Sequence, residues 1–164
     1  MKIDIQTEFK IRNSKSEDHI KIIEVMEDWW DGRDLTWMVP KLFLIHFNNT
    51  SFIVKKNNNL VAFLIAFLSP ANAKEGYIHI VGVHPDYRGL RIGEYLYNQF
   101  FQICRDHNRN TVRSCTSPIN RGSIEFHRRI GFKIRKGNSV INGIDVTLDY
   151  NKPGDTKVLF EINI

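Results

Sequence analysis

The feature that most constrains the fold is one continuous segment in the middle of the chain. Residues 77–83 (Tyr-Ile-His-Ile-Val-Gly-Val) alternate in polarity, as a half-buried strand does. A Pro-Asp turn at residues 85–86 follows, and then a loop rich in Gly and Arg opens an amphipathic helix expected over residues 90–107. A strand that feeds a helix through a short loop predicts a sheet covered by helices.

The loop Arg88–Gly93 has the features of a phosphate site. Gly89 and Gly93 let the backbone approach a ligand closely, because no Cβ intervenes. The first N–H groups of the helix that follows have no partner within the helix, and the helix dipole favours an anion at that end. Arg88 and Arg91 add positive charge. The alternative is a plain connecting loop, because such turns are common.

The remaining chain has the pattern of alternating helices and strands without a linker or repeat. The expected strands are residues 3–12, 51–56, 60–69, 75–83, 111–116, 132–135, 144–150 and 157–162. The other expected helices are residues 17–29, 40–47 and 120–130. This order predicts an α/β (α+β) fold, a mixed central sheet of about seven strands with helices on both faces. The length of 164 residues fits a single domain, residues 1–164.

Composition excludes several classes of function. The net charge of +5 is too small and too dispersed to indicate a nucleic-acid partner. The longest apolar run, Leu60–Leu68, is too short to cross a membrane, and the N-terminus lacks the apolar region of a signal peptide. We therefore expect a cytoplasmic protein. Neither the six histidines nor the two cysteines have metal-ligand spacing, so no metal is expected.

A second motif makes the phosphate interpretation specific. Residues 120–132 (Asn-Arg-Gly-Ser-Ile-Glu-Phe-His-Arg-Arg-Ile-Gly-Phe) predict a helix that begins at Asn120 and ends at Gly131. This motif and the segment 83–93 resemble the two coenzyme A-binding motifs of the GNAT superfamily of N-acetyltransferases. The order of elements over residues 8–163 also fits. The chain departs from the family pattern at Arg91, where the middle Gly of the loop is usual, and at His127, where Tyr is common.

The resemblance implies a GNAT fold that binds acetyl-CoA as cosubstrate and transfers its acetyl group directly to an amine. The main chain of the strand end is then expected to contact the pantetheine arm, and the loop and the second motif to contact the rest of the cofactor. The expected cofactor-binding residues are Val81, Gly82, Val83, Arg88, Gly89, Leu90, Arg91, Ile92, Gly93, Asn120, Ser123, Phe126 and His127. For Asn120 a plain helix cap is the alternative, and for Gly82 a bulge.

The resemblance also implies catalytic residues. His79 lies on the strand before the loop, where family members often carry Glu or His, and a neutral imidazole suits proton removal from an amine. A hydrogen-bonded core histidine is the alternative. His127 occupies the place of a Tyr that is thought to protonate the leaving thiolate in many members. Tyr77 faces the same side of the strand as His79 and is the third catalytic candidate.

The resemblance also implies that the first two helices and their connection form the acceptor side. Here that connection holds Trp29, Trp30, Asp31 and Asp34, which together can attract a cationic amine. The alternative is an aromatic-anchored turn with solvated acids. We expect a small-molecule primary amine, with a peptide or lysine acceptor, or a non-catalytic acyl-CoA sensor, as alternatives. A homodimer that pairs the C-terminal strand, residues 158–162, is a further expectation.

Overall fold

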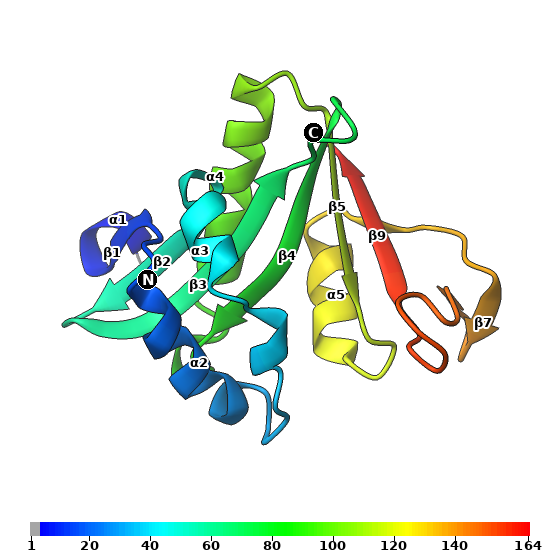
Figure 1. Ribbon diagram of the computed structural model, residues 1–164, viewed down its shortest axis with the longest axis horizontal. Helices are drawn as coiled ribbons and strands as arrows, with labels where there is room; N and C mark the ends of the chain where they lie inside the picture. Colours follow the sequence, from blue (N-terminus) through cyan, green and yellow to red (C-terminus); the bar gives the residue numbers. More distant parts are fainter. Residues whose placement is uncertain (1–3) are drawn as a thin grey trace. The chain divides into compact units, whose positions relative to one another are not determined.

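The computed structural model describes residues 4–164, and a seven-stranded mixed sheet runs through it (Figure 1). The strand order is β1-β2-β3-β4-β5-β9-β6. Its members are β1 (Lys10–Asn13), β2 (Phe52–Lys56), β3 (Asn59–Leu68), β4 (Glu75–Val83), β5 (Thr111–Thr116), β6 (Lys133–Ile134) and β9 (Val158–Asn163). The pair β4–β5 is parallel, whereas β1–β2, β2–β3, β5–β9 and β6–β9 are antiparallel. The predicted mixed sheet of about seven strands is confirmed.

Helices connect these strands close to the predicted positions. The longer ones are α2 (Asp18–Trp29), α4 (Ile92–Asp106) and α5 (Arg121–Arg129), and the shorter ones are α3 (Leu42–His46), η1 (Thr36–Met38), η2 (Asn48–Thr50) and η3 (Pro85–Tyr87). A small separate sheet pairs β7 (Ser139–Ile141) with β8 (Ile144–Val146). The sequence pattern missed β7, and the strand expected over residues 144–150 ends early.

The expected N-terminal strand over residues 3–12 is only partly correct. Residue 3 lies outside the described residues, and Ile5–Glu8 form a short helix, α1. The Asp4 carboxylate accepts a hydrogen bond from the N–H of Gln6, at 3.1 Å, and so caps this turn. Alternation of polar and apolar residues does not report such a cap, so the strand begins only at Lys10.

The chain divides into two compact units. One comprises the chain up to Leu68 together with Ile78–Ile103, and the other comprises Ser69–Tyr77 and Cys104–Ile164. Strand β4 passes from one unit to the other at Tyr77. The single domain expected from length stays a prediction.

The first unit has a core between its strands and its N-terminal helices. Apolar side chains of α2, α3 and β2–β4 form one buried cluster: Ile22, Met26, Trp29, Val39, Leu44, Ile53, Phe63, Ile65 and Ile80. Figure 1 shows α2 and α3 in front of β2 and β3, with α4 behind them. The β2–β3 hairpin closes through Asn57 and Asn58, with φ of 48° and 70°, as the run of asparagines predicts.

The second unit packs α5 against its strands through His127 and Phe160 of β9. Strand β9 pairs with β5 on one side and with β6 on the other. The C-terminal strand therefore lies inside the sheet, which corrects the expectation that it offers a free edge for dimer formation. Among residues 4–164, no helix is both long enough and apolar enough to cross a bilayer.

Candidate functional site

The loop between β4 and α4 has two residues in the left-handed backbone region. Gly89 has φ of 84°, and Arg91 has φ of 62°. Glycine adopts this region at no steric cost, whereas a residue with a Cβ is disfavoured there by about 1 kcal/mol or more. Arg91 thus keeps the backbone conformation that a glycine would favour at this position. The replacement of the usual glycine by Arg91 therefore does not prevent the loop from adopting its left-handed backbone conformation.

This backbone conformation leaves several main-chain donors available. Within residues 4–164, the N–H groups of Gly89, Arg91, Ile92 and Gly93 make no hydrogen bond. Helix α4 begins at Ile92, so its positive end lies at the same point. Arg91 is exposed and Leu90 half-buried. Four free donors at a helix N-terminus fit the oxygens of a diphosphate.

The Arg88 side chain anchors this loop to its own unit. Its Nε donates to the Val83 carbonyl at 3.2 Å, and its Nη2 donates to the Trp29 carbonyl at 2.5 Å. Two of the guanidinium's donors are therefore bonded to main-chain oxygens at the ends of β4 and α2. This arrangement holds the loop in place, and it favours an indirect role of Arg88 in anion binding.

Strand β4 carries buried and half-buried residues in strict alternation. Gly76, Ile78, Ile80 and Gly82 are buried, and the residues between them, including Val81 and Val83, are half-buried. A Cβ at Gly82 would lie 2.5 Å from the Phe63 Cε1 atom and 2.8 Å from the Trp30 Cη2 atom. Gly82 is therefore required by the two rings that pack on it, and the expected contact of its main chain with the cofactor stays a prediction.

His79 lies on the half-buried side of β4 and is held at both its edge and its face. Its Nε2 lies 2.6 Å from the Met38 carbonyl oxygen. Its ring stacks on Phe43 with centroids 4.5 Å apart and planes 8° from parallel. Burial lowers the pKa of His79, and the hydrogen bond to the Met38 carbonyl acts in the opposite direction. His79 is thus neutral at pH 7.

The sequence did not indicate Met38 and Phe43 as site residues. They lie more than thirty positions before His79 and carry no chemical signature of their own. Only the fold brings η1 and α3 to β4.

Tyr77 pairs with Cys115 in the second unit. The Tyr77 hydroxyl donates to the Cys115 Sγ at 3.3 Å. Burial, followed by the nearby thiol, raises the pKa of Tyr77 well above its usual range. Burial also raises the pKa of Cys115. The β4–β5 ladder comprises three residue pairs, from Glu75 opposite Thr111 to Tyr77 opposite Arg113, so Tyr77 stands at the last register of the ladder and Cys115 lies two residues beyond it.

The second motif forms helix α5 as predicted. The Asn120 Oδ1 accepts from the N–H of Ser123 at 3.1 Å and caps the helix. The Nδ1–H of His127 donates to the Ser123 carbonyl at 2.7 Å. His127 is only 2% exposed, and burial lowers its pKa to about 4. This environment favours a packing role for His127 over proton donation. The other two expected residues of α5, Ser123 and Phe126, are half-buried.

The expected acceptor residues divide into two groups. Trp29 is 4% exposed and stacks on Phe63, so it belongs to the core of the first unit. Trp30 is half-buried, and Asp31 and Asp34 are exposed. The Asp34 Oδ1 accepts from the Thr36 hydroxyl and N–H, at 2.6 and 3.0 Å, and these bonds lower its pKa. The structure thus leaves Trp30, Asp31 and Asp34 available to a ligand.

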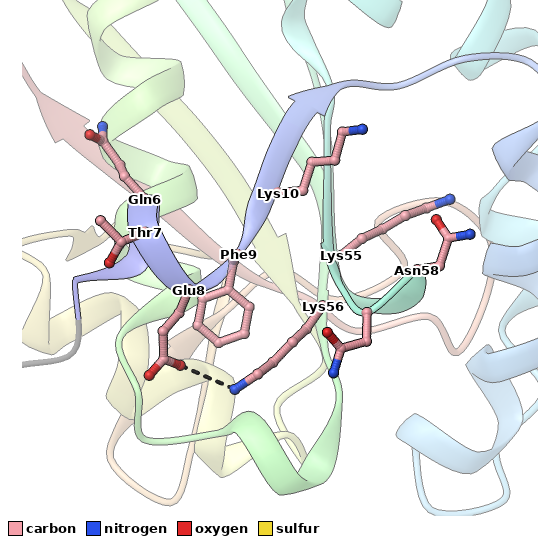
Figure 2. A pocket seen from close by; sticks show the side chains of 9 residues that line it. Gln6, Thr7, Glu8, Phe9, Lys10, Lys55, Lys56 and Asn58 are labelled. Atoms are coloured by element: carbon pink, nitrogen blue, oxygen red, sulfur yellow. Dashed lines mark hydrogen bonds and ion pairs between the residues drawn. The ribbon is translucent and has the colours of Figure 1, made fainter.

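A separate hollow of about 380 Å³ lies beside the N-terminal strand (Figure 2). It is lined by residues 6–10 and 55–58, which include three lysines. Lys56 is ion-paired with Glu8 at 3.2 Å, and its Nζ lies 5.3 Å from the centroid of the Phe9 ring. Figure 2 shows Lys56 reaching toward Glu8 past the Phe9 ring. None of the residues expected from the sequence lines this hollow.

The first unit therefore offers main-chain donors that fit the diphosphate of a coenzyme A thioester. A Cβ at Gly89 would meet no atom within 4 Å, so space is open on that side of the loop. In the described part of the chain, no three His, Cys, Asp or Glu residues gather in a way that can hold a metal ion.

The comparison with known sequences agrees with this geometry. The acetyltransferase (GNAT) family profile matches residues 12–132. An uncharacterized N-acetyltransferase from Methanocaldococcus jannaschii is 31% identical over 86 residues, which cover 50% of this chain. The match spans only 38% of the length of that relative.

Solved structures show the same fold at low identity. Ard1 from Thermoplasma volcanium superposes with a TM-score of 0.73 and 17% identity, covering 96% of this chain and 98% of that one. Naa50 from Arabidopsis thaliana, in complex with the bisubstrate analogue CoA-Ac-MVNAL, also gives a TM-score of 0.73 and 17% identity, covering 96% and 99%. The two motifs, the fold and the matching profile together show that the chain belongs to the acetyltransferase (GNAT) family.

Proposed function

We propose that the protein transfers an acetyl group from acetyl-CoA to a primary amine. The observation that carries this proposal is the set of free N–H donors of Gly89, Arg91, Ile92 and Gly93 at the N-terminus of α4. A main-chain anion site of this kind, in a member of this family, supports binding of the coenzyme A diphosphate. Bound acetyl-CoA supplies an activated acetyl thioester.

The residues of the chain would hold the cofactor and prepare the amine. The loop donors bind the diphosphate, and Arg88 fixes the loop through the carbonyls of Val83 and Trp29. The main chain of Val81–Val83 is proposed to contact the pantetheine arm. Asn120, Ser123 and Phe126 stay predicted cofactor contacts.

His79 is proposed as the general base. An alkylammonium has a pKa near ~10 and must lose a proton for its nitrogen to attack. Because burial keeps His79 neutral at pH 7, its imidazole can accept that proton. Tyr77, whose pKa is raised, is proposed to act only in its neutral hydroxyl form.

The acceptor is proposed to be a small cationic amine bound beside Trp30, Asp31 and Asp34. The two carboxylates are exposed, and Trp30 is half-buried. Charge attraction and cation–π contact both favour an ammonium group there. A peptide α-amine is the alternative, which the likeness of the fold to a structure solved with a peptide-containing analogue keeps open.

Two measurements test this function. Calorimetric titration with coenzyme A tests the loop, and we expect saturable binding. Thiol release from acetyl-CoA with a panel of small amines and short peptides tests the reaction. His79→Gln keeps a donor for the Met38 carbonyl but removes the base, so we expect a loss of kcat of about 100-fold or more with coenzyme A binding unchanged.

The possible results separate the alternatives. No heat with coenzyme A would contradict the loop assignment. Binding without turnover on any amine or peptide would support an acyl-CoA sensor. Turnover on peptides alone would overturn the small-amine acceptor.

A further inference from the structure

The segment from η1 to α3 touches His79 at two points. The Met38 carbonyl lies at the end of η1, 2.6 Å from Nε2, and the Phe43 ring of α3 covers one face of the imidazole. A carbonyl oxygen can only accept a hydrogen bond, so in the neutral ring Nε2 must carry the proton. The lone pair of the imidazole therefore lies on Nδ1. Among residues 4–164, Nδ1 has no hydrogen-bond partner.

Resting on the proposed function, we infer that Met38 and Phe43 are positioning residues that hold His79 as its Nε2–H tautomer, so that Nδ1 is the atom that takes the acceptor's proton. The carbonyl selects the tautomer and fixes the ring edge. The flat contact with Phe43, 8° from parallel, prevents the imidazole from turning about its own axis. A base whose orientation is fixed before the amine arrives loses less entropy in the reaction.

The proposed proton transfer runs from the acceptor nitrogen to Nδ1 of His79. The Nδ1 lone pair forms a bond to one proton of the acceptor nitrogen, and the electrons of the broken N–H bond stay on that nitrogen for attack. The product on the protein side is an imidazolium. Its Nε2–H still donates to the Met38 carbonyl, which stabilises the charge, and the proton leaves from Nδ1 to water.

The charged groups on the surrounding elements do not set the pKa of His79. The causes of its lowered pKa are burial and, in the opposite direction, the Met38 carbonyl, with no charged side chain among them. The titratable groups on the surrounding elements are Glu75 and Tyr77 on β4, and Lys41 and His46 at the two ends of α3. Glu75 is ion-paired with Arg113 at 2.7 Å, and Lys41 and His46 are exposed. The ring environment is thus set by Phe43 and the main chain.

The closing experiment compares two ring deletions in one aromatic cluster. Phe43 stacks on His79, whereas Phe47 touches Phe43 and Phe67, at 5.6 and 5.1 Å. Phe43→Leu and Phe47→Leu therefore remove rings of equal size, and only the first ring covers the imidazole. Phe43→Tyr keeps the ring at position 43, which is half-buried, and is the conservative variant.

The first readout is direct and independent of activity. Long-range 1H–15N NMR of the full-length protein reports which nitrogen of His79 is protonated and its titration midpoint. We expect the Nε2–H form in the wild type. In Phe43→Leu we expect a midpoint raised by about half a pH unit or more, because water reaches the ring, and no change in Phe47→Leu. Phe43→Tyr is expected to restore the wild-type midpoint.

The second readout is the pH profile of kcat with a saturating amine. The acid limb of Phe43→Leu is expected to move with the NMR midpoint, and kcat to fall about fivefold or more, with the KM for acetyl-CoA unchanged. An Nδ1–H tautomer in the wild type, or equal effects of Phe43→Leu and Phe47→Leu, would overturn the inference. If the NMR results hold but His79→Gln keeps full activity, the positioning stands and the role of His79 as base fails.

Discussion

The imidazole of His127 lies flat against the phenyl ring of Phe160, with centroids 4.1 Å apart and planes 3° from parallel. Phe132 adds an edge contact at 5.1 Å. A charged ring in this aromatic surrounding would lose its hydration. His127 is therefore a core residue of the second unit that happens to be titratable.

Stability is expected to depend on pH through His127. Burial depresses its pKa from 6.5 in the unfolded chain to about 4 in the folded chain. As pH falls below 6.5, His127 binds a proton in the unfolded chain but stays neutral in the folded chain. The protein therefore loses stability between pH 6.5 and 4. The full loss is about 3 kcal/mol. Urea denaturation at pH 7, 5.5 and 4.5 measures it.

The matched variant for this prediction is His127→Phe, which keeps an aromatic ring beside Phe160. The free energy of unfolding of this variant is expected to change much less with pH than that of the wild type over the same range. Equal slopes in wild type and variant would show that another group causes the dependence.

Two substitutions of Arg91 test the backbone conformation of the loop Arg88–Gly93 separately from its charge. Its φ of 62° is tolerated by Asn but strongly disfavoured for a β-branched residue. Arg91→Asn is expected to keep stability and to weaken coenzyme A binding about threefold to tenfold through loss of charge. Arg91→Val is expected to lose about 1–2 kcal/mol of stability and more affinity. Thermal denaturation and calorimetric titration test both, and identical behaviour of the two variants would contradict the left-handed assignment.

Gly82 is expected to be intolerant of a single methyl group. Its Cβ would meet Phe63, which is fully buried, and Trp30 at less than 3 Å. Gly82→Ala is expected to cost about 2 kcal/mol by overpacking. Gly122→Ala is the control, because it lies on α5 with its nearest neighbouring atom 4.0 Å away, and it is expected to gain about 0.5 kcal/mol of helix propensity. Chemical denaturation compares the two, and a Gly82→Ala protein as stable as the control would refute the contact.

The exposed carboxylates are expected to act on amine affinity by charge alone. Asp34→Asn keeps the Oδ1 atom that accepts both bonds from Thr36, so the turn is preserved. Combined with Asp31→Asn, it is expected to raise the KM of a cationic amine about threefold or more at low salt, and the difference is expected to shrink in 0.5 M NaCl. Glu125→Gln removes the charge of one exposed carboxylate on α5 and serves as the control. An unchanged KM would remove the acceptor assignment.

Local sequence determined those features that depend on neighbouring residues. The alternation of Glu75–Val83, the paired asparagines of the hairpin and the Asn120 cap each act within a few positions, so β4, the β2–β3 turn and the start of α5 follow from the printed sequence. The free N–H groups of Ile92 and Gly93 are of the same kind, because the first turn of a helix leaves its N–H groups unpaired.

Only the tertiary structure decided how side chains distant in sequence meet. Sequence reasoning placed Trp29 at the acceptor and His127 in catalysis, but burial against Phe63 and Phe160 depends on strands far along the chain. The same holds for Met38 and Phe43, which fix His79 across about forty residues. Hydrogen-bond partners and desolvation set the protonation of a histidine, and both arise only when separate elements pack together.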